Sequence, residues 1–221
     1  MTECQTSLLR DGAAAGFSLE WDLAGPAEEA LAALSTVDTD TVTIGIGSPL
    51  AEATGATIPG LRPFTRIDGA AGMPATQRAV WAFVTADDPG VAFAQAEALQ
   101  ARLSGPFRLA IATPLFRYGG GRDLTGYIDG TANPAADAAV NAAFVTGGPA
   151  ANSSFALVQR YLHFRSRFQR RPETERRRLS AAIDVSHDYR CQRAQRLRGG
   201  HEFHRPRYRS RGKRGGISLD A

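Results

Sequence analysis

The chain has 221 residues, of which 43% are hydrophobic, and its formal net charge is +4. This length allows one large domain or two small ones with a sizeable core. No run approaches the roughly 18 apolar residues that a membrane helix needs, and the N-terminus has no apolar export segment. Cys4 and Cys191 fit no zinc or CxxC spacing. The composition therefore predicts a reduced, cytoplasmic, globular protein without a membrane partner.

The net charge hides a division of the chain into an acidic part and a basic part. Residues 1–163 hold nine arginines and 16 acidic residues, a net charge of −7. Residues 164–221 hold 16 arginines, Lys213 and six acidic residues, a net charge of +11. Such asymmetry is typical of a basic tail that meets nucleic acid or an anionic surface by charge alone. From Ser180 onward apolar periodicity is almost absent, so we expect no packed core there.

The first half of the chain predicts a regular order of strands and helices. Apolar alternation predicts a strand over 15–25, and Pro26, at a first helical position, begins a helix over 27–35. The remaining elements are strands at 41–48, 79–87 and 107–114, a short helix at 49–55, a loop at 58–74, and a long helix over 88–105 capped by Asp87 or Asp88. Apart from the short helix, the order is βαββαβ. We therefore predict an α+β, ferredoxin-like unit, an antiparallel sheet with both helices on one face.

The pattern changes after this unit. Residues 134–145 are alanine-rich and predict a helix, residues 153–163 predict a strong strand, and residues 164–179 predict an amphipathic helix. By its position, the strand would begin a second unit of the same kind. We therefore expect a first ferredoxin-like domain over residues 1–145 and an incomplete second one over 146–221.

One loop, GRDLTGYIDGTANP at residues 121–134, contains more charged residues and glycines than a turn requires. Gly126 and Gly130 let the backbone turn sharply and let a bulky group approach closely. Asp129 between them would be presented from a rigid turn. The plainer alternative is a turn-and-cap arrangement in which Asp129 bonds its own backbone.

The extended string FRYGGGRDLTGYIDGTANP closely resembles the GxxDG signature of the dye-decolourising peroxidases, a haem family built from two ferredoxin-like units. Four further segments are similar to that family in order and spacing: TIGIGSPL, IPGLRPFTRIDG, AVWAFVTADDP and SSFALVQRYLH. The resemblance covers roughly residues 15 to 163.

The resemblance implies a role for each matching residue of the loop. Asp129 would be the catalytic acid–base residue on the distal side of haem b, moving a proton from the near to the far oxygen of hydrogen peroxide. Four residues would lie against the haem: Gly126, Ile128, Gly130 and Thr131. Arg122 would hold the shape of the loop, face a haem propionate, or both.

The residue that would bind the haem iron is left open by the sequence. The family's proximal histidine follows the signature aspartate by about seventy residues, within a Ser-His pair. His201 lies 72 residues after Asp129 but has no preceding serine, whereas His187 follows Ser186 but lies 58 residues after it. Each could also be an ordinary surface histidine. The family's distal arginine segment has no counterpart.

A change of reading frame after residue 163 would explain the charge jump, the lost periodicity and the early end together. The family-like PETE at 172–175 places any such change later than Phe168. This hypothesis predicts that the downstream DNA encodes the family's second half in another frame. A stop codon without that homology would exclude it.

The sequence thus predicts a peroxidase that reduces hydrogen peroxide while oxidising an organic donor. The alternative is a non-catalytic remnant, or a haem-binding protein, whose basic tail binds anionic partners. The resemblance also implies two kinds of protein partner, since family members are often homo-oligomers and some are packaged inside protein shells.

Overall fold

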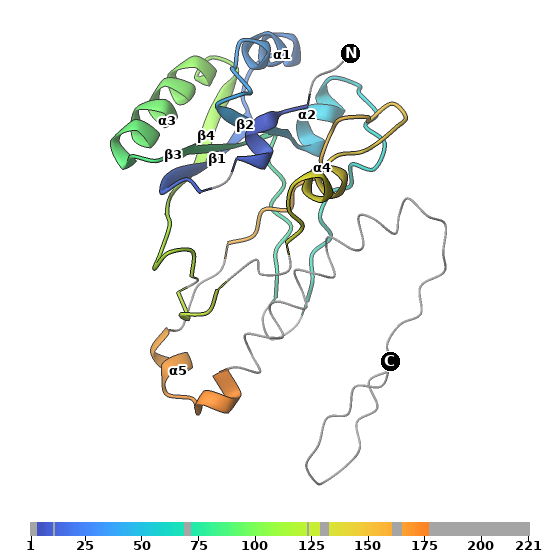
Figure 1. Cartoon of the computed structure of the whole chain (residues 1–221). Helices are drawn as coiled ribbons and strands as arrows, with labels where there is room; N and C mark the ends of the chain where they lie inside the picture. Colours follow the sequence, from blue (N-terminus) through green and yellow to red (C-terminus); the bar gives the residue numbers. More distant parts are fainter. Residues whose placement is uncertain are drawn as a thin grey trace, which may run out of the picture.

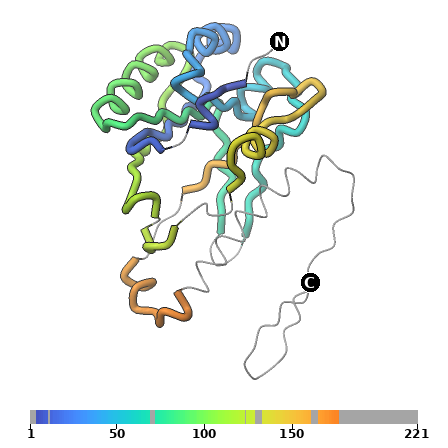
Figure 2. The backbone as a smooth tube through the Cα atoms, in the orientation of Figure 1, coloured from blue at the N-terminus to red at the C-terminus, as the bar shows by residue number. Residues whose placement is uncertain are grey.

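The computed structural model places one sheet with helices packed on it at the N-terminal end of the chain (Figures 1 and 2). The residues that it describes are 4–10, 12–68, 72–122, 124–128, 133–160 and 165–176. The predicted absence of a packed core beyond Ser180 concerns residues outside these ranges.

Four strands form one antiparallel sheet in the order β2-β3-β1-β4. They are β1 (Ala15–Leu23), β2 (Val42–Ile46), β3 (Val80–Ala86) and β4 (Phe107–Phe116). Each lies where the alternation of apolar residues predicts a strand. Leu19 of β1 pairs with Ala82 of β3 and with Ala112 of β4. This order and these pairings confirm the ferredoxin-like unit.

Two helices, α1 (Ala27–Ser35) and α3 (Pro89–Leu103), cover the same face of the sheet (Figure 1). The side chains between the helices and the sheet form the core, with Trp21 and Leu103 fully buried. A register shift between Glu20 and Trp21 pairs Trp21 with Leu109 of β4, and Leu109 packs against this core. The core is therefore formed by the apolar side chains that the predicted alternation places on the helix-covered face of the strands.

The hydrogen bonds at the start of α3 identify the aspartate that caps this helix. The Asp88 carboxylate accepts hydrogen bonds from the backbone N–H groups of Gly90 (2.8 Å) and Val91 (3.0 Å), so Asp88 satisfies donors that the first turn leaves free. At α1 the expectation was wrong by one position, because Pro26 precedes the helix as its N-cap. Its carbonyl oxygen accepts from the N–H of Ala30 at 3.0 Å.

The outer edge of β2 is covered by the N-terminal segment. The side-chain amide of Gln5 donates to the carbonyl of Ile44 (2.8 Å) and accepts from its N–H (2.7 Å). The 3-10 helix η1 (Thr6–Leu9) follows, and its Ser7 hydroxyl bonds that of Thr43 at 2.8 Å. These bonds occupy backbone groups that an edge strand would otherwise leave free.

The strand predicted over 153–163 is not present in its described part, residues 153–160. A strand exists through a ladder of hydrogen bonds to a neighbour. Residues 154–158 make no hydrogen bond to any residue that the structure describes. This segment has the predicted sequence character, but no described residue supplies the partner strand that a sheet requires.

The helix predicted over 164–179 is interrupted. The helix α5 spans Arg165–Gln169, and helical residues resume at 173–176, after Pro172. Proline has no N–H and its ring clashes with the preceding turn, so a continuous helix cannot pass through it. The helix predicted over 134–145 is present as α4 (Asp137–Ala143), and a further short helix, α2, spans Ser48–Ala53. No helix in the described ranges has the length and apolar character needed to cross a bilayer.

Candidate functional site

The loop that follows β4 turns sharply, as its glycines predict. Gly119, Gly120, Gly121 and Gly126 all have positive φ, with Gly126 at 97°. The N–H groups of Gly121 and Arg122 both donate to the carbonyl oxygen of Tyr118, at 3.0 and 2.9 Å. Left-handed backbone of this kind is adopted readily only by glycine. The glycine-rich string is therefore needed for the path of the backbone.

Arg122 fastens the two sides of this loop. Its Nη1 atom donates to the carbonyl oxygen of Gly126 at 2.9 Å, and Arg122 forms an isolated antiparallel bridge with Ile128. The side chain that was expected to hold the loop's shape does so, through a backbone carbonyl. Any contact of Arg122 with a haem propionate stays a prediction.

Arg117 also positions the loop, although no local sequence pattern predicted this role. Its backbone N–H donates to the carbonyl oxygen of Ala14, the residue before β1 (2.8 Å), and its Nη1 donates to the carbonyl oxygen of Gly12 at 3.2 Å. The guanidinium lies over Gly121, where an added Cβ would stand 3.3 Å from Nη2. Arg117 therefore ties the beginning of the loop to the N-terminal segment. Only the fold brings residues so far apart in the chain together.

Three large apolar side chains of this region are exposed: Phe116 (69%), Tyr118 (41%) and Ile128 (53%). A Cβ at Gly126 would meet no atom of a described residue within 4 Å. Exposed apolar residues beside an open turn are suited to contact with an apolar group. This is the character that a haem edge would require of Ile128 and Gly126.

The other predicted site residues lie outside the described residues. These are Asp129, Gly130, Thr131, His187 and His201. All four histidines of the chain fall there. Within the described ranges, no three His, Cys, Asp or Glu side chains gather as a metal site would need. The catalytic and iron-binding assignments therefore stay predictions.

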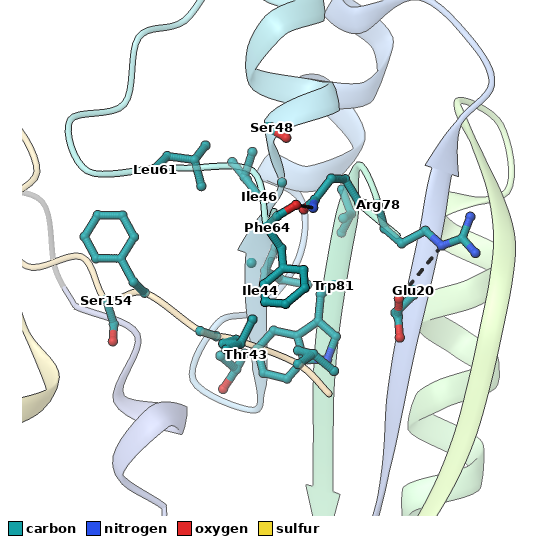
Figure 3. Close-up of a pocket in the computed structure, with 18 of the residues that line it drawn as sticks. Glu20, Thr43, Ile44, Ile46, Ser48, Leu61, Phe64, Arg78, Trp81 and Ser154 are labelled. Carbon is teal, nitrogen blue, oxygen red and sulfur yellow. Dashed lines mark hydrogen bonds and ion pairs between the residues drawn. The ribbon is translucent and has the colours of Figure 1, made fainter. Parts of the chain in front are cut away.

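A cavity of about 520 Å³ includes Trp81 in its lining, and Trp81 lies on the face of the sheet opposite to the core residue Ala82. Its walls are the loop 58–64 and residues 152–160, and its floor includes Ile44 and Trp81 (Figure 3). The predicted site residues that the structure describes, Arg122, Gly126 and Ile128, are not part of its lining.

An ion-pair group lies on the same face of the sheet as this cavity. Arg78 Nη1 donates to Asp22 at 2.9 Å, and Arg78 Nε lies 3.9 Å from Glu20 (Figure 3). Arg108 approaches the other oxygen of Asp22 at 3.5 Å. The hydrogen bond from Arg78, with the charges of both arginines, lowers the pKa of the Asp22 carboxyl from its ordinary value. This group is a structural clamp across the sheet, because its charges neutralise one another.

Comparison with known proteins connects the fold to a family. The family model described as "Dyp-type peroxidase, C-terminal" matches residues 120–179. The matched range begins inside the glycine-rich loop and continues through the PETE segment, beyond residue 163. A search of the curated proteins found no match.

Solved structures share the fold of the chain. The dye-decolorizing protein from V. cholerae is 21% identical, with a TM-score of 0.60 over 65% of this chain and 54% of its own. DyPB from Rhodococcus jostii RHA1 is 21% identical, with a TM-score of 0.55 over 65% and 53%. A DypB variant from that organism, solved in complex with heme, is 20% identical, with a TM-score of 0.56 over 63% and 51%. The chain thus spans about half the length of these structures.

The fold and the loop define an α+β protein with a ferredoxin-like unit followed by a glycine-rich, arginine-fastened turn. Residues 120–179 match the C-terminal model of the Dyp-type peroxidases, and the fold is similar to that of solved dye-decolourising peroxidases. The chain thus resembles this family in the matched segment and in its fold.

Proposed function

We propose that the chain acts as a haem-dependent peroxidase of the dye-decolourising type, reducing hydrogen peroxide to water while oxidising an organic donor. The observation that carries the proposal is the loop fastened by Arg122 to Gly126, which leads directly into Asp129. The family match over residues 120–179 supports it.

The described residues fit a haem. Ile128, Phe116 and Tyr118 offer exposed apolar surface, and no described residue stands within 4 Å of a Cβ at Gly126. Such a surface suits the apolar edge of a porphyrin. His201, or His187 in its place, would bind the iron of one haem b per chain. The bound haem would supply the electrons that cleave the peroxide O–O bond.

Asp129 would perform the proton chemistry. A carboxylate carried on a fastened turn keeps one position relative to peroxide. It would take the proton from the near oxygen and deliver it to the far oxygen, so that the far oxygen leaves as water. Two electrons from the organic donor and two protons complete the reduction of peroxide to two waters.

A spectroscopic titration tests this function. Hemin is added to the purified full chain, and the Soret region is recorded before and after one equivalent of hydrogen peroxide. We expect a sharp histidine-ligated band that changes with peroxide, and loss of that band in His201→Ala or in His187→Ala. Asp129→Asn should keep the band and lose the rapid peroxide response. A broad band like that of free hemin, unaffected by all three substitutions, would refute the proposal.

The net charge of +11 over residues 164–221 favours a second candidate, a remnant that binds anionic partners through its basic tail. Its affinity for an RNA or DNA oligomer should fall steeply as salt rises, and should not depend on hemin. A histidine-ligated band without any peroxide response would instead indicate haem binding without turnover.

A further inference from the structure

The residues before β1, which are 5–10 and 12–14 and which we call the N-terminal strap, cross one end of the sheet. This end is where β1 and β2 begin and where β3 and β4 end. Gln5 bonds the strap to Ile44 of β2, at one edge of the sheet. The strap then leads into β1, which lies beside the opposite edge strand, β4. It therefore connects the two sides of the sheet at this end.

Arg117 fastens the glycine-rich loop to the strap. Its backbone N–H donates to the carbonyl oxygen of Ala14 at 2.8 Å, and its Nη1 donates to that of Gly12 at 3.2 Å. The guanidinium lies against two glycines, because an added Cβ would stand 3.7 Å from Nη1 at Gly12 and 3.3 Å from Nη2 at Gly121. Both glycines have positive φ, 83° and 98°. Arg117 thus packs on backbone that glycine adopts most readily.

The strap also lies against the helix that follows the loop. Its 3-10 helix η1 contacts α4, which begins at Asp137. The helix η1 is itself bonded to the sheet, because the buried hydroxyl of Ser7 bonds that of Thr43 at 2.8 Å. The chain between Arg117 and α4, which contains Asp129, therefore meets the strap at both of its ends.

The hydrogen bonds inside the loop fix its shape but not its place on the sheet. Arg122 donates to the carbonyl oxygen of Gly126. The N–H groups of Gly121 and Arg122 donate to that of Tyr118. All these bonds join residues of the loop to one another, so the loop could still tilt as a unit. A displacement of about 1 Å at a reacting group can cost on the order of 100-fold in rate, so the way the ends are held decides whether Asp129 is well placed.

We propose that the N-terminal strap sets the position of the glycine-rich loop on the sheet, with Arg117 as the positioning residue that joins the two. Loosening the strap at Gln5, on the far edge of the sheet, then loosens the loop as well. The structural part of this inference holds with or without haem. Its consequence for peroxide chemistry rests on the proposed function.

Amide hydrogen exchange of the full chain, without hemin, tests the structural part. The reporters are the N–H groups of Gly121 and Arg122, because their bonds to the turn protect them. We expect Arg117→Ala and Gln5→Ala each to accelerate this exchange by roughly fivefold, the effect of losing about one hydrogen bond. The matched control is Gln77→Ala. The Gln77 amide also bonds a backbone carbonyl, at 3.0 Å, but it precedes β3 at the other end of the sheet.

A second comparison isolates the contact between Arg117 and Gly121. Gly120→Ala and Gly121→Ala both place a Cβ on backbone of positive φ. Only the Cβ at Gly121 meets described atoms within 4 Å, and these are guanidinium atoms of Arg117. Gly121→Ala should therefore accelerate exchange at Arg122 more than Gly120→Ala does. The difference should shrink in an Arg117→Ala background, as expected of residues in contact.

The hemin-loaded chain tests the consequence for chemistry. Arg117→Ala and Gln5→Ala should keep the Soret band and slow its change with peroxide, whereas Gln77→Ala should match the unmodified chain. Arg117→Lys should be slowed too, because it keeps the charge but lacks the planar group that covers the glycines. Full recovery by lysine would show a charge effect and overturn the positioning role.

The two experiments fail in different ways. If the unmodified chain binds no hemin, the proposed function fails, while hydrogen exchange still decides the role of the strap. Tryptophan fluorescence checks that each variant keeps its folded sheet. Unchanged exchange in Arg117→Ala or in Gln5→Ala, or equal acceleration in Gln77→Ala, would overturn the inference.

Discussion

The Nη1 atom of Arg122 lies 2.9 Å from the carbonyl oxygen of Gly126, and this hydrogen bond closes the turn that precedes Asp129. Arg122 is exposed, so we expect the bond to act locally. Arg122→Ala should accelerate amide hydrogen exchange in residues 118–128 while changing the free energy of unfolding by less than about 1 kcal/mol. Arg66→Ala, which removes an exposed ion pair with Asp68 in another loop, is the control. Unchanged exchange in Arg122→Ala would show that the glycines alone hold the turn.

Asp22 should make the stability of the sheet depend on pH. Arg78 and Arg108 hold the pKa of the Asp22 carboxyl below its ordinary value in the folded chain. The contribution of the ion pair is therefore complete above the unfolded pKa and is lost as the pH falls through the folded pKa. Asp22→Asn should be less stable than the unmodified chain at pH 7, and the difference should shrink on acidification. Urea unfolding at several pH values measures this, and a difference independent of pH would contradict the assignment.

Gly47 should not tolerate a side chain. A Cβ at this position would overlap the carbonyl oxygen of Arg78, whereas a Cβ at Gly105 would meet nothing within 4 Å. Gly47→Ala should therefore lower the free energy of unfolding by more than about 2 kcal/mol, and Gly105→Ala should change it by less than about 0.5 kcal/mol. Denaturant unfolding compares the two. Equal effects would mean that the backbone at Gly47 relaxes without cost.

Asp88 should stabilise α3, and its neighbour Asp87 should not. The Asp88 carboxylate bonds two free N–H groups of the first turn, and loss of such a cap costs about 1 kcal/mol. Asp88→Ala should show this loss in thermal or urea unfolding. Asp87→Ala should lie close to the unmodified chain, and an equal loss in both variants would argue for a general charge effect at the helix start.

The sequence by itself determined the four strands of the sheet, the helices α1 and α3 and the turn of the loop, because each depends on local pattern. Alternation along β1 shows which side chains face the core, and glycine is the residue that a positive φ at Gly126 requires. The family likeness also follows from a short string of residues. Pro172 was visible in the sequence as well, although the apolar pattern around it suggested an unbroken helix.

Only the tertiary structure decided which distant groups meet. Arg117 reaches Gly12, Arg78 clamps Asp22, and Gln5 covers the edge of β2, and none of these pairings leaves a local pattern. The segment at 153–160 is a further case in which the local sequence does not decide the structure. Its residues prefer a strand, but a strand requires hydrogen bonds from a second segment, and local preference cannot supply that partner.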